Sequence, residues 1–495
     1  MNLLSTIALA ALAFAPAAPA PQVTFLPSEG SPLVSLRIQF NVGSAHDPAG
    51  KEGLAALTAA MIAEGGSEEM SYGRILDAFY PMAAGLYGGA RKEVTTFVGD
   101  VHRDNLDAYT AIVVGLLTKP RFAPEDFERL RNEAIDELTK TLRGSNDEEL
   151  GKWTLQTRLY DRTSPYGHVD RGTVAGLRSI TLDDVRAFHA ANYTRARLHL
   201  GVAGGTDRAY VDRLTRALEV LPAGGSAPTL DVKQAAPRDG LKVTIVEKPA
   251  EASAISIGAP IAVTRADDDF YALAVANSYL GEHRTFNGKL MQDLRGKRGL
   301  NYGDYSYIED FIQEGGGTFP ISNNPRRVQY FSIWIRPVPA DKTVFALRAA
   351  LWEWKRLVDK GMTEAEFEAT RSFLLNYSKL WVQTPSRRLG YAMDGVFYGR
   401  DDVVTELARR LPKLTVADVN NAVRKHLSFP GFEVAVVAKD ARGLEQLLRS
   451  GKPTPITYDT EGTPADVLAE DREIAVFPLE RVDVRIIPVA EMFEK

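Results

Sequence analysis

The chain has 495 residues, of which 45% are hydrophobic and 25% charged, so it can bury more than one core and should form at least two domains. A formal charge of -5 without a long basic run argues against nucleic acid as a partner. Because cysteine is absent, disulfides, thiolate zinc sites and cysteine nucleophiles are excluded.

The first twenty residues form an apolar run with small residues and an Ala-x-Ala pattern near Ala15 to Ala20. This pattern is typical of a secretory signal peptide, although Lys and Arg are missing from its start. A mis-called start codon or a lipid-facing anchor would also fit. We expect a cleaved signal over 1–20 and a periplasmic or secreted protein. No later segment has the roughly 20 uninterrupted apolar residues of a spanning helix, so the mature chain should not cross a membrane.

The elements that follow occur in two similar halves. Each half opens with an alternating strand, predicted at 34–42 and at 252–260, and each strand precedes a helix, predicted at 54–64 and at 268–281. The stretch 221–239 between the halves is rich in Pro, Gly and Ala and has no apolar period, so it reads as a linker. This repetition favours an internal duplication.

A second pair of matching segments lies near the end of each half. Thr181 and Thr415 each precede a helical pattern, and an aspartate, Asp184 or Asp418, follows three residues later. This spacing predicts a capping box at the start of both helices. A strand follows each helix, at 198–203 and at 433–438.

Long helical stretches occupy the middle of each half, and their apolar residues recur every three or four positions. They are predicted at 104–117, 124–142, 343–360 and 363–380. We therefore predict an α+β fold of two homologous domains, each with helices layered on one face of a mostly antiparallel sheet. The alternating segment 482–489 should be an edge strand. The predicted domains are 22–225 and 241–450, with a linker at 226–240 and a docking tail at 451–495.

The segment from Gly43 to Met61, GSAHDPAGKEGLAALTAAM, resembles the opening of insulinase and pitrilysin-type zinc peptidases. In that family a strand, an acidic turn and Gly-Leu-Ala lead into His-x-x-Glu-His on a helix, where residues four apart direct both imidazoles at one zinc ion. Here the three positions are Ala56, Ala59 and Ala60. Alanine has no donor atom, so this chain alone should not hydrolyse peptides.

Glu137 lies 77 residues beyond Ala60, a spacing that resembles the family's third zinc ligand. A single carboxylate cannot hold catalytic zinc, and an ordinary helix-surface acid is the simpler interpretation. None of the seven histidines has the spacing of a replacement motif. We therefore expect no metal in this chain.

The segment Phe286–Arg298 has the pattern of an amphipathic helix, Gly299 fits its C-terminal cap, and the strand-like stretch 301–308 follows. Arg295 and Tyr302 lie seven residues apart within Leu-Arg-x-x-x-Gly-Leu-x-Tyr. This arrangement resembles the pair with which the family's second domain completes the active site. The alternative is that Arg295 pairs with a helix acid, Glu282 or Asp293, and that Tyr302 is a half-buried strand aromatic.

The resemblance implies two such domains related by pseudo-twofold symmetry, forming half of a clamshell that closes around a peptide. In the family's two-chain members one subunit carries zinc and the other the Arg–Tyr pair, and this chain matches the second. It implies that Tyr302 donates to the developing oxyanion and that Arg295 holds a substrate carbonyl, with zinc in a homologous partner. Gly315, Gly316 and Gly317 are a weaker candidate for a substrate loop, or a plain hairpin connection. The rival function is a structural or binding subunit, like the core proteins of respiratory complexes.

Overall fold

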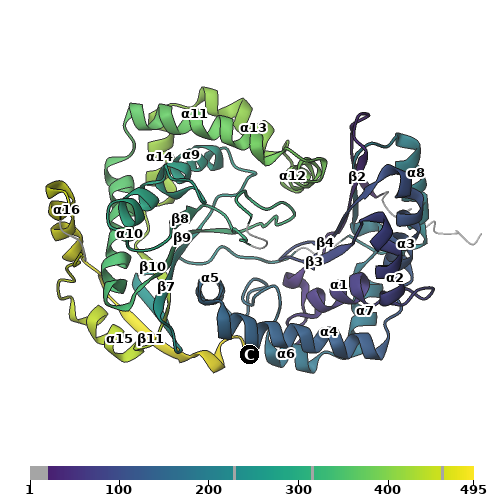
Figure 1. Cartoon of the computed structure of the whole chain (residues 1–495), viewed down its shortest axis with the longest axis horizontal. Coiled ribbons are helices and arrows are strands. Elements are labelled where there is room, and N and C mark those ends of the chain that lie inside the picture. The colour runs from purple at the N-terminus through teal and green to yellow at the C-terminus, as the bar shows by residue number, and fades with distance from the viewer. Residues whose placement is uncertain (1–20, 227–229, 314–316, 459–461) are drawn as a thin grey trace, which may run out of the picture.

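The computed structural model describes residues 21–226, 230–313, 317–458 and 462–495. Two sheets, each with its own helices, lie on opposite sides of the molecule (Figure 1). The purple and blue half precedes the linker, and the teal to yellow half follows it. The predicted signal peptide at 1–20 lies outside the described residues, as do Gly315 and Gly316.

The first sheet has the strand order β1-β5-β2-β4-β3, in which β1 and β5 run parallel and the other neighbours antiparallel. Its strands are β1 (Gln22–Pro27), β2 (Leu33–Phe40), β3 (Tyr87–Ala90), β4 (Thr95–His102) and β5 (Leu198–Gly204). The helices of this half are α1 (Leu54–Glu64), α2 (Tyr72–Phe79), α3 (Leu106–Thr118), α4 (Pro124–Asp136), α5 (Asp147–Leu159), α6 (Val174–Ser179), α7 (Leu182–Asn192) and α8 (Arg208–Ala217).

The second sheet has the order β11-β6-β10-β7-β9-β8. Its strands are β6 (Gly240–Glu247), β7 (Ala252–Ile261), β8 (Asp304–Tyr307), β9 (Gln329–Pro339), β10 (Gly431–Ala438) and β11 (Asp483–Pro488). The helices are α9 (Asp269–Gly281), α10 (Thr343–Lys360), α11 (Glu364–Trp381), α12 (Pro385–Tyr398), α13 (Val403–Arg410), α14 (Val416–His426), α15 (Ala441–Ser450) and α16 (Ala465–Ala475).

The two sheets confirm the duplication. The order β1-β5-β2-β4-β3 corresponds strand by strand to β6-β10-β7-β9-β8, and β11 is added outside β6 as the predicted edge strand. Both predicted capping boxes form. The hydroxyl oxygens of Thr181 and Thr415 accept hydrogen bonds from the backbone N–H groups of Asp184 and Asp418. The two aspartate carboxylates accept hydrogen bonds from the backbone N–H groups of the threonines. The α+β class with two homologous halves is therefore correct.

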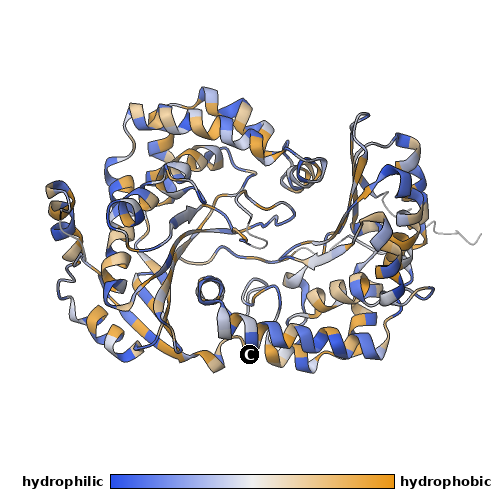
Figure 2. Cartoon of the chain, viewed as in Figure 1, coloured by the Kyte–Doolittle hydropathy of each residue, from blue (hydrophilic) through white to orange (hydrophobic). Residues whose placement is uncertain are grey.

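Strand alternation decides which side of the first sheet holds the core. Val34 and every second residue to Phe40 are buried against the helices of their own half. Arg37, on the opposite face, donates through Nε to the Ser386 carbonyl of α12 at 3.1 Å. Figure 2 shows the same pattern in both halves, with apolar residues concentrated between helices and sheet. The core of each half therefore lies on one face of its sheet.

The other face of each sheet is covered by a helix from the opposite half. Helix α5 of the first half packs on β7 and β10, and α12 of the second half packs on β1, β2 and β5 (Figure 1). A glycine of β5 allows the close approach of α12, since a Cβ added at Gly201 would lie 2.4 Å from Met393 Sδ. This exchange of helices joins the halves.

A buried group of polar side chains, which we call the interface cluster, lies where α5 meets the second half. The Asp310 carboxylate accepts hydrogen bonds from Tyr330 Oη at 2.6 Å, and from Gln156 Nε2 and Asn324 Nδ2, both at 2.9 Å. Arg326 Nη1 pairs with the same carboxylate at 3.0 Å, and the two side chains are 1% and 3% exposed. Because Gln156 belongs to α5, the cluster links the halves.

Three predicted elements differ in extent. The segment Phe286–Arg298 becomes helical only at Lys289. Gly288, just before it, packs so tightly that an added Cβ would lie 2.8 Å from Gly281 Cα. The helix predicted over 124–142 ends at Asp136 and continues as a π-helix to Ser145. Strand β8 begins only at Asp304, because the Gly303 N–H donates to Asn301 Oδ1 in a side-chain turn.

Within the described ranges, no helix has the length and apolarity needed to span a membrane.

A degenerate zinc motif and an exposed Arg–Tyr pair

Helix α1 begins at a fully polar cap. The Asp47 carboxylate accepts hydrogen bonds from the Gly53 and Ala55 N–H groups, both at 2.7 Å, and His168 Nε2 lies 3.3 Å away. Gly53 has a φ of 109°, which favours glycine. Burial raises the pKa of the Asp47 carboxyl, against the opposing effect of these hydrogen bonds. The acidic turn of the sequence is thus the N-terminal cap of α1.

Methyl groups occupy the three motif positions on α1. Ala59 is fully buried, and Ala56 and Ala60 are half-buried against the first core. Strand β3 passes close to this part of the helix, since a Cβ added at Gly88 would lie 3.0 Å from the Ala59 carbonyl oxygen. None of these side chains can bind a metal, so the residues present do not fit a zinc ion here.

Glu137 lies at the junction of α4 and the π-helix Glu137–Ser145. Its Oε1 forms an ion pair with Arg171 Nη1 at 3.0 Å, and both side chains are partly exposed. The Arg171 guanidinium also lies 5.4 Å from the ring centroid of Trp153. A cation therefore lies next to the acid whose spacing matched the third ligand. Among the residues that the structure describes, no group of three or more His, Cys, Asp or Glu could hold a metal ion.

The structure brings Arg295 and Tyr302 into direct contact. The Arg295 guanidinium lies 4.7 Å from the ring centroid of Tyr302, which is 71% exposed. The backbone turn between them depends on Gly299, whose φ is 60° and whose N–H donates to the Arg295 carbonyl at 2.8 Å. The contacts expected from the simpler alternative differ from those observed: Tyr302 is exposed, and no ion pair joins Arg295 to Glu282 or Asp293 within the described ranges.

Two residues extend this contact that the sequence did not single out. Phe286, 68% exposed, lies with its ring centroid 5.1 Å from the Arg295 guanidinium. The Arg336 guanidinium lies 5.6 Å from the Tyr302 ring centroid. We call these four side chains the Arg–Tyr stack. Phe286 could have been identified from the sequence, because it is the first residue of the motif segment. Arg336 could not, because it lies on the next strand, β9, and belongs to no sequence motif.

The Arg–Tyr stack holds guanidinium donors beside the exposed ring of Tyr302. A guanidinium that lies over an aromatic ring uses its face for the ring and leaves its N–H groups at the edge. Arg336 Nε donates to Glu148 Oε1 at 2.9 Å, which ties the stack to α5 of the first half.

The role of Gly317, which is exposed, remains a prediction, like those of Gly315 and Gly316.

Asp304 lies beneath the stack and is fully buried. Its Oδ1 accepts a hydrogen bond from Asn301 Nδ2 at 2.6 Å, whereas Oδ2 has no partner among the described residues. Burial raises the pKa of Asp304 to about 8, although the Asn301 hydrogen bond and the charges of Arg336 and Arg295 lower it. The folded protein thus retains a proton that the unfolded chain releases above about pH 4.

We expect an Asp304→Asn variant to become more stable relative to the wild type as the pH rises. The folded pKa of Asp304 is raised, so its contribution to stability is lost as pH increases towards 8, and asparagine removes this dependence. Between pH 6 and 8 the difference in unfolding free energy should grow by about 2 kcal/mol. Denaturant titrations at both pH values measure it. Asp107→Asn, at a carboxylate that is 90% exposed, is the matched control and should show no such trend.

Together these observations define a class: a duplicated α+β chain of the zinc-peptidase type that has lost its metal donors. The model described as Insulinase (Peptidase family M16) matches residues 23–156, and the one described as Peptidase M16 inactive domain matches residues 179–374. The chain belongs to this insulinase-like family, as a member without the zinc motif.

Some of the relatives that match most of the chain are named as proteases, and another is named as a non-peptidase homolog. The non-peptidase homolog YmxG of Helicobacter pylori is 22% identical over 82% of this chain and 89% of its own. An uncharacterized zinc protease of Mycobacterium tuberculosis is 24% identical over 72% and 78%. The crystal structure of a peptidase M16 inactive domain from Pseudomonas fluorescens has a TM-score of 0.73 at 23% identity, over 84% of this chain and 95% of that one. This likeness supports the shared fold.

Proposed function

We propose that this chain is the non-zinc subunit of a heteromeric metallopeptidase and is inactive alone. The observation that carries the proposal is the exposed Tyr302 held against the Arg295 guanidinium. An aromatic ring that is 71% exposed contributes little to the core, so its stacking on a cation is better explained by a ligand than by packing. The alanines at the motif positions mean that zinc and the attacking nucleophile belong to the partner.

The Arg–Tyr stack has the donors that peptide hydrolysis needs. As a scissile carbonyl becomes tetrahedral, its oxygen gains negative charge, and donors that are already oriented stabilise that charge more than they stabilise the substrate. In the proposed complex the Tyr302 hydroxyl donates to this oxygen. The guanidinium edge of Arg295 holds a neighbouring substrate carbonyl, and the rings of Tyr302 and Phe286 fix its plane.

A second candidate is a structural or binding subunit without a catalytic role. The name of the Helicobacter pylori relative, a non-peptidase homolog, favours it. In that case the Arg–Tyr stack would contact a permanently bound partner, and its loss would weaken assembly without changing any turnover. The two candidates therefore differ in whether a zinc-bearing homologue gains activity from this chain.

The test is co-expression with a homologous chain that carries His-x-x-Glu-His, followed by cleavage assays with fluorogenic peptides. We expect no cleavage by this chain alone, little by the partner alone and strong cleavage by the purified complex. A zinc content of one ion per complex should accompany it, with none in this chain. Peptidase activity or stoichiometric zinc in the isolated chain would contradict the proposal. A stable complex without added activity would favour the structural candidate.

We also propose that the protein is exported. The support is the apolar run at 1–20, with its small residues before position 21. Mass spectrometry of the protein from the periplasm or culture medium should find a mature chain that lacks roughly these residues. Full-length protein in the cytosol alone would overturn the proposal.

A further inference from the structure

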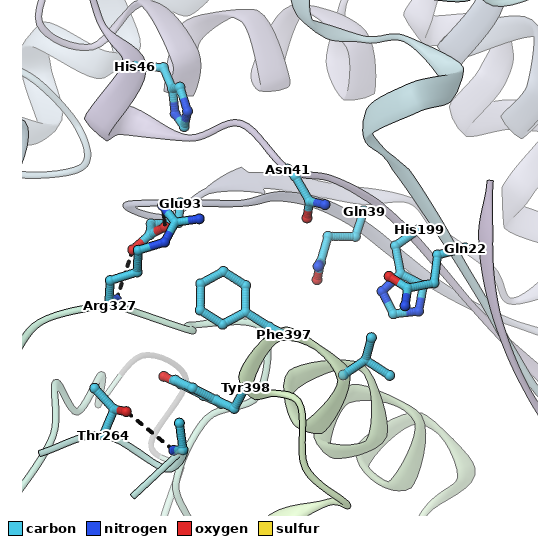
Figure 3. Close-up of a pocket in the computed structure, with 12 residues that line it drawn as sticks. Gln22, Gln39, Asn41, His46, Glu93, His199, Thr264, Arg327, Phe397 and Tyr398 are labelled. Carbon is cyan, nitrogen blue, oxygen red and sulfur yellow. Dashed lines mark hydrogen bonds and ion pairs between the residues drawn. The ribbon is translucent and has the colours of Figure 1, made fainter. Parts of the chain in front are cut away.

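A cavity of about 480 Å³ lies beside the C-terminal end of α12, on the face of the first sheet that α12 partly covers (Figure 3). This volume is within the range of small-molecule sites. Both halves of the chain line it, but no member of the Arg–Tyr stack does. The lining residues are Gln22, Gln39, Asn41, His46, Glu93 and His199 from the first half and Thr264, Ala266, Arg327, Val396, Phe397 and Tyr398 from the second.

The floor of the cavity is a row of polar side chains across three neighbouring strands. His199 on β5 is the register partner of Gln22 on β1 and of Gln39 on β2. Asn41 follows Gln39 by two residues and lies on the same side in Figure 3. Among the described residues, the carboxamides of Gln22 and Asn41 make no hydrogen bonds, so both can serve a ligand. The backbones of β5 and β2 are paired on both sides, so these two strands offer side chains only.

The two imidazoles at the cavity are neutral. Burial lowers the pKa of His46 and of His199 to about 4. The Gly43 N–H donates to His46 Nδ1 at 3.1 Å, so the proton of this ring must be on Nε2. That Nε2 has no hydrogen-bond partner among the described residues, and Figure 3 shows the ring directed towards the cavity. His46 is therefore a donor without an acceptor.

The opposite wall combines an ion pair with an aromatic ring. Arg327 Nη1 pairs with Glu93 Oε2 at 2.5 Å, so the charges within the lining cancel. The Arg327 guanidinium lies 5.7 Å from the ring centroid of Phe397, whose side chain projects into the space between Arg327 and Gln39 in Figure 3. Val396 and Phe397 give this wall an apolar surface.

Within the described residues, the second sheet has no equivalent cavity at the corresponding position, because side chains occupy that space. Strand register places Lys242, Glu433 and Gly258 where the first half has Gln22, His199 and Gln39. There Leu155 of α5 approaches within 3.0 Å of a Cβ added at Gly258, and Arg238 Nε from the linker pairs with Glu433 at 2.7 Å. The cavity is therefore not a necessary consequence of the fold.

From these contacts we propose that the cavity binds a neutral saccharide of one or two rings. A sugar ring has a C–H face, which fits Phe397 and Val396, and an edge of hydroxyl groups that both donate and accept, which fits carboxamides and an ion pair. A polyanion or polycation does not match a lining without net charge. An extended peptide would add to a sheet through a free strand edge, and the two central strands of the floor, β5 and β2, have none.

The test is ligand-observed saturation-transfer NMR on the full chain with maltose, lactose and diacetylchitobiose. We expect at least one disaccharide to bind, with the strongest transfer at its ring C–H protons. Phe397→Ala and Asn41→Ala should each weaken binding at least tenfold. Tyr80→Ala, at a tyrosine that is 88% exposed in the first half, is the control and should bind like the wild type.

Three outcomes would overturn the proposal. They are no binding of any of the three disaccharides, equal binding by Phe397→Ala and the wild type, and binding of trialanine at the same site with competition against the sugar. Asn41→Ala reports independently if the Phe397 variant does not fold. Circular dichroism of each variant establishes that it is folded. The result is independent of peptidase activity, because the assay contains neither a partner nor a cleavable peptide.

Discussion

A Tyr302→Phe variant should assemble normally with the zinc-bearing partner but turn over peptide about 10²–10³ times more slowly. Removing one oriented donor to a developing oxyanion typically costs about 2.7–4 kcal/mol of transition-state stabilisation. The ring and its contact with Arg295 remain, so the packing of the stack is unchanged. The loss should therefore occur in kcat, with little change in KM. Steady-state kinetics of the purified complex measures both constants.

The matched control for this variant is Tyr80→Phe, which removes a hydroxyl from another exposed ring. Its complex should turn over like the wild type. Arg295→Lys adds a second comparison, because lysine keeps the charge but loses the planar fork and raises KM if the guanidinium holds a substrate carbonyl. Normal turnover by the Tyr302→Phe complex would show that the hydroxyl takes no part in catalysis.

An Asp310→Ala variant should lose about 3–5 kcal/mol of stability, which is the usual effect of leaving a buried charge unpaired. The buried Arg326 guanidinium would lose its counter-ion, and Tyr330 Oη and Gln156 Nε2 would lose an acceptor. Because Gln156 belongs to the first half, the contact between the halves should loosen as well. Denaturant titration measures the stability, and limited proteolysis of the linker measures the loosening.

A double variant, Arg326→Met with Asp310→Leu, should recover only part of the lost stability, because it removes the unpaired charge but still leaves Tyr330 Oη and Gln156 Nε2 without the Asp310 acceptor. The surface pair of Arg208 and Asp212 serves as a control, since Asp212→Ala should change stability by less than about 1 kcal/mol. An Asp310→Ala variant no less stable than Asp212→Ala would mean that the interface cluster contributes nothing to holding the halves together.

Much of the fold and part of the candidate site could be predicted from local patterns. The strands β2 and β7 and the capping boxes at Thr181 and Thr415 depend on residues close together in the chain, and they form close to where the sequence predicts them. The contact of Arg295 with Tyr302 also follows from a short segment with a glycine at its turn.

The parts that could not be predicted depend on contacts between distant residues. Arg336 reaches Tyr302 through the pairing of β8 with β9, and a cation from far along the chain, Arg171, neutralises Glu137. The cavity at Phe397 exists because α12 crosses to the other half and ends before it covers Asn41. None of these contacts has a periodic signal, since each depends on where two halves meet.

The sequence by itself determined that α1 has no metal donors, because a helix fixes which residues share a face and alanine contributes no ligand atom at any of the three positions. It also determined the duplication. Only the tertiary structure decided that each sheet receives a helix from the other half, that Asp304 is buried beneath the Arg–Tyr stack, and that Tyr302 is exposed. The reason is physical: burial and charge pairing are properties of packed surfaces, and those surfaces form only when segments far apart in sequence come together.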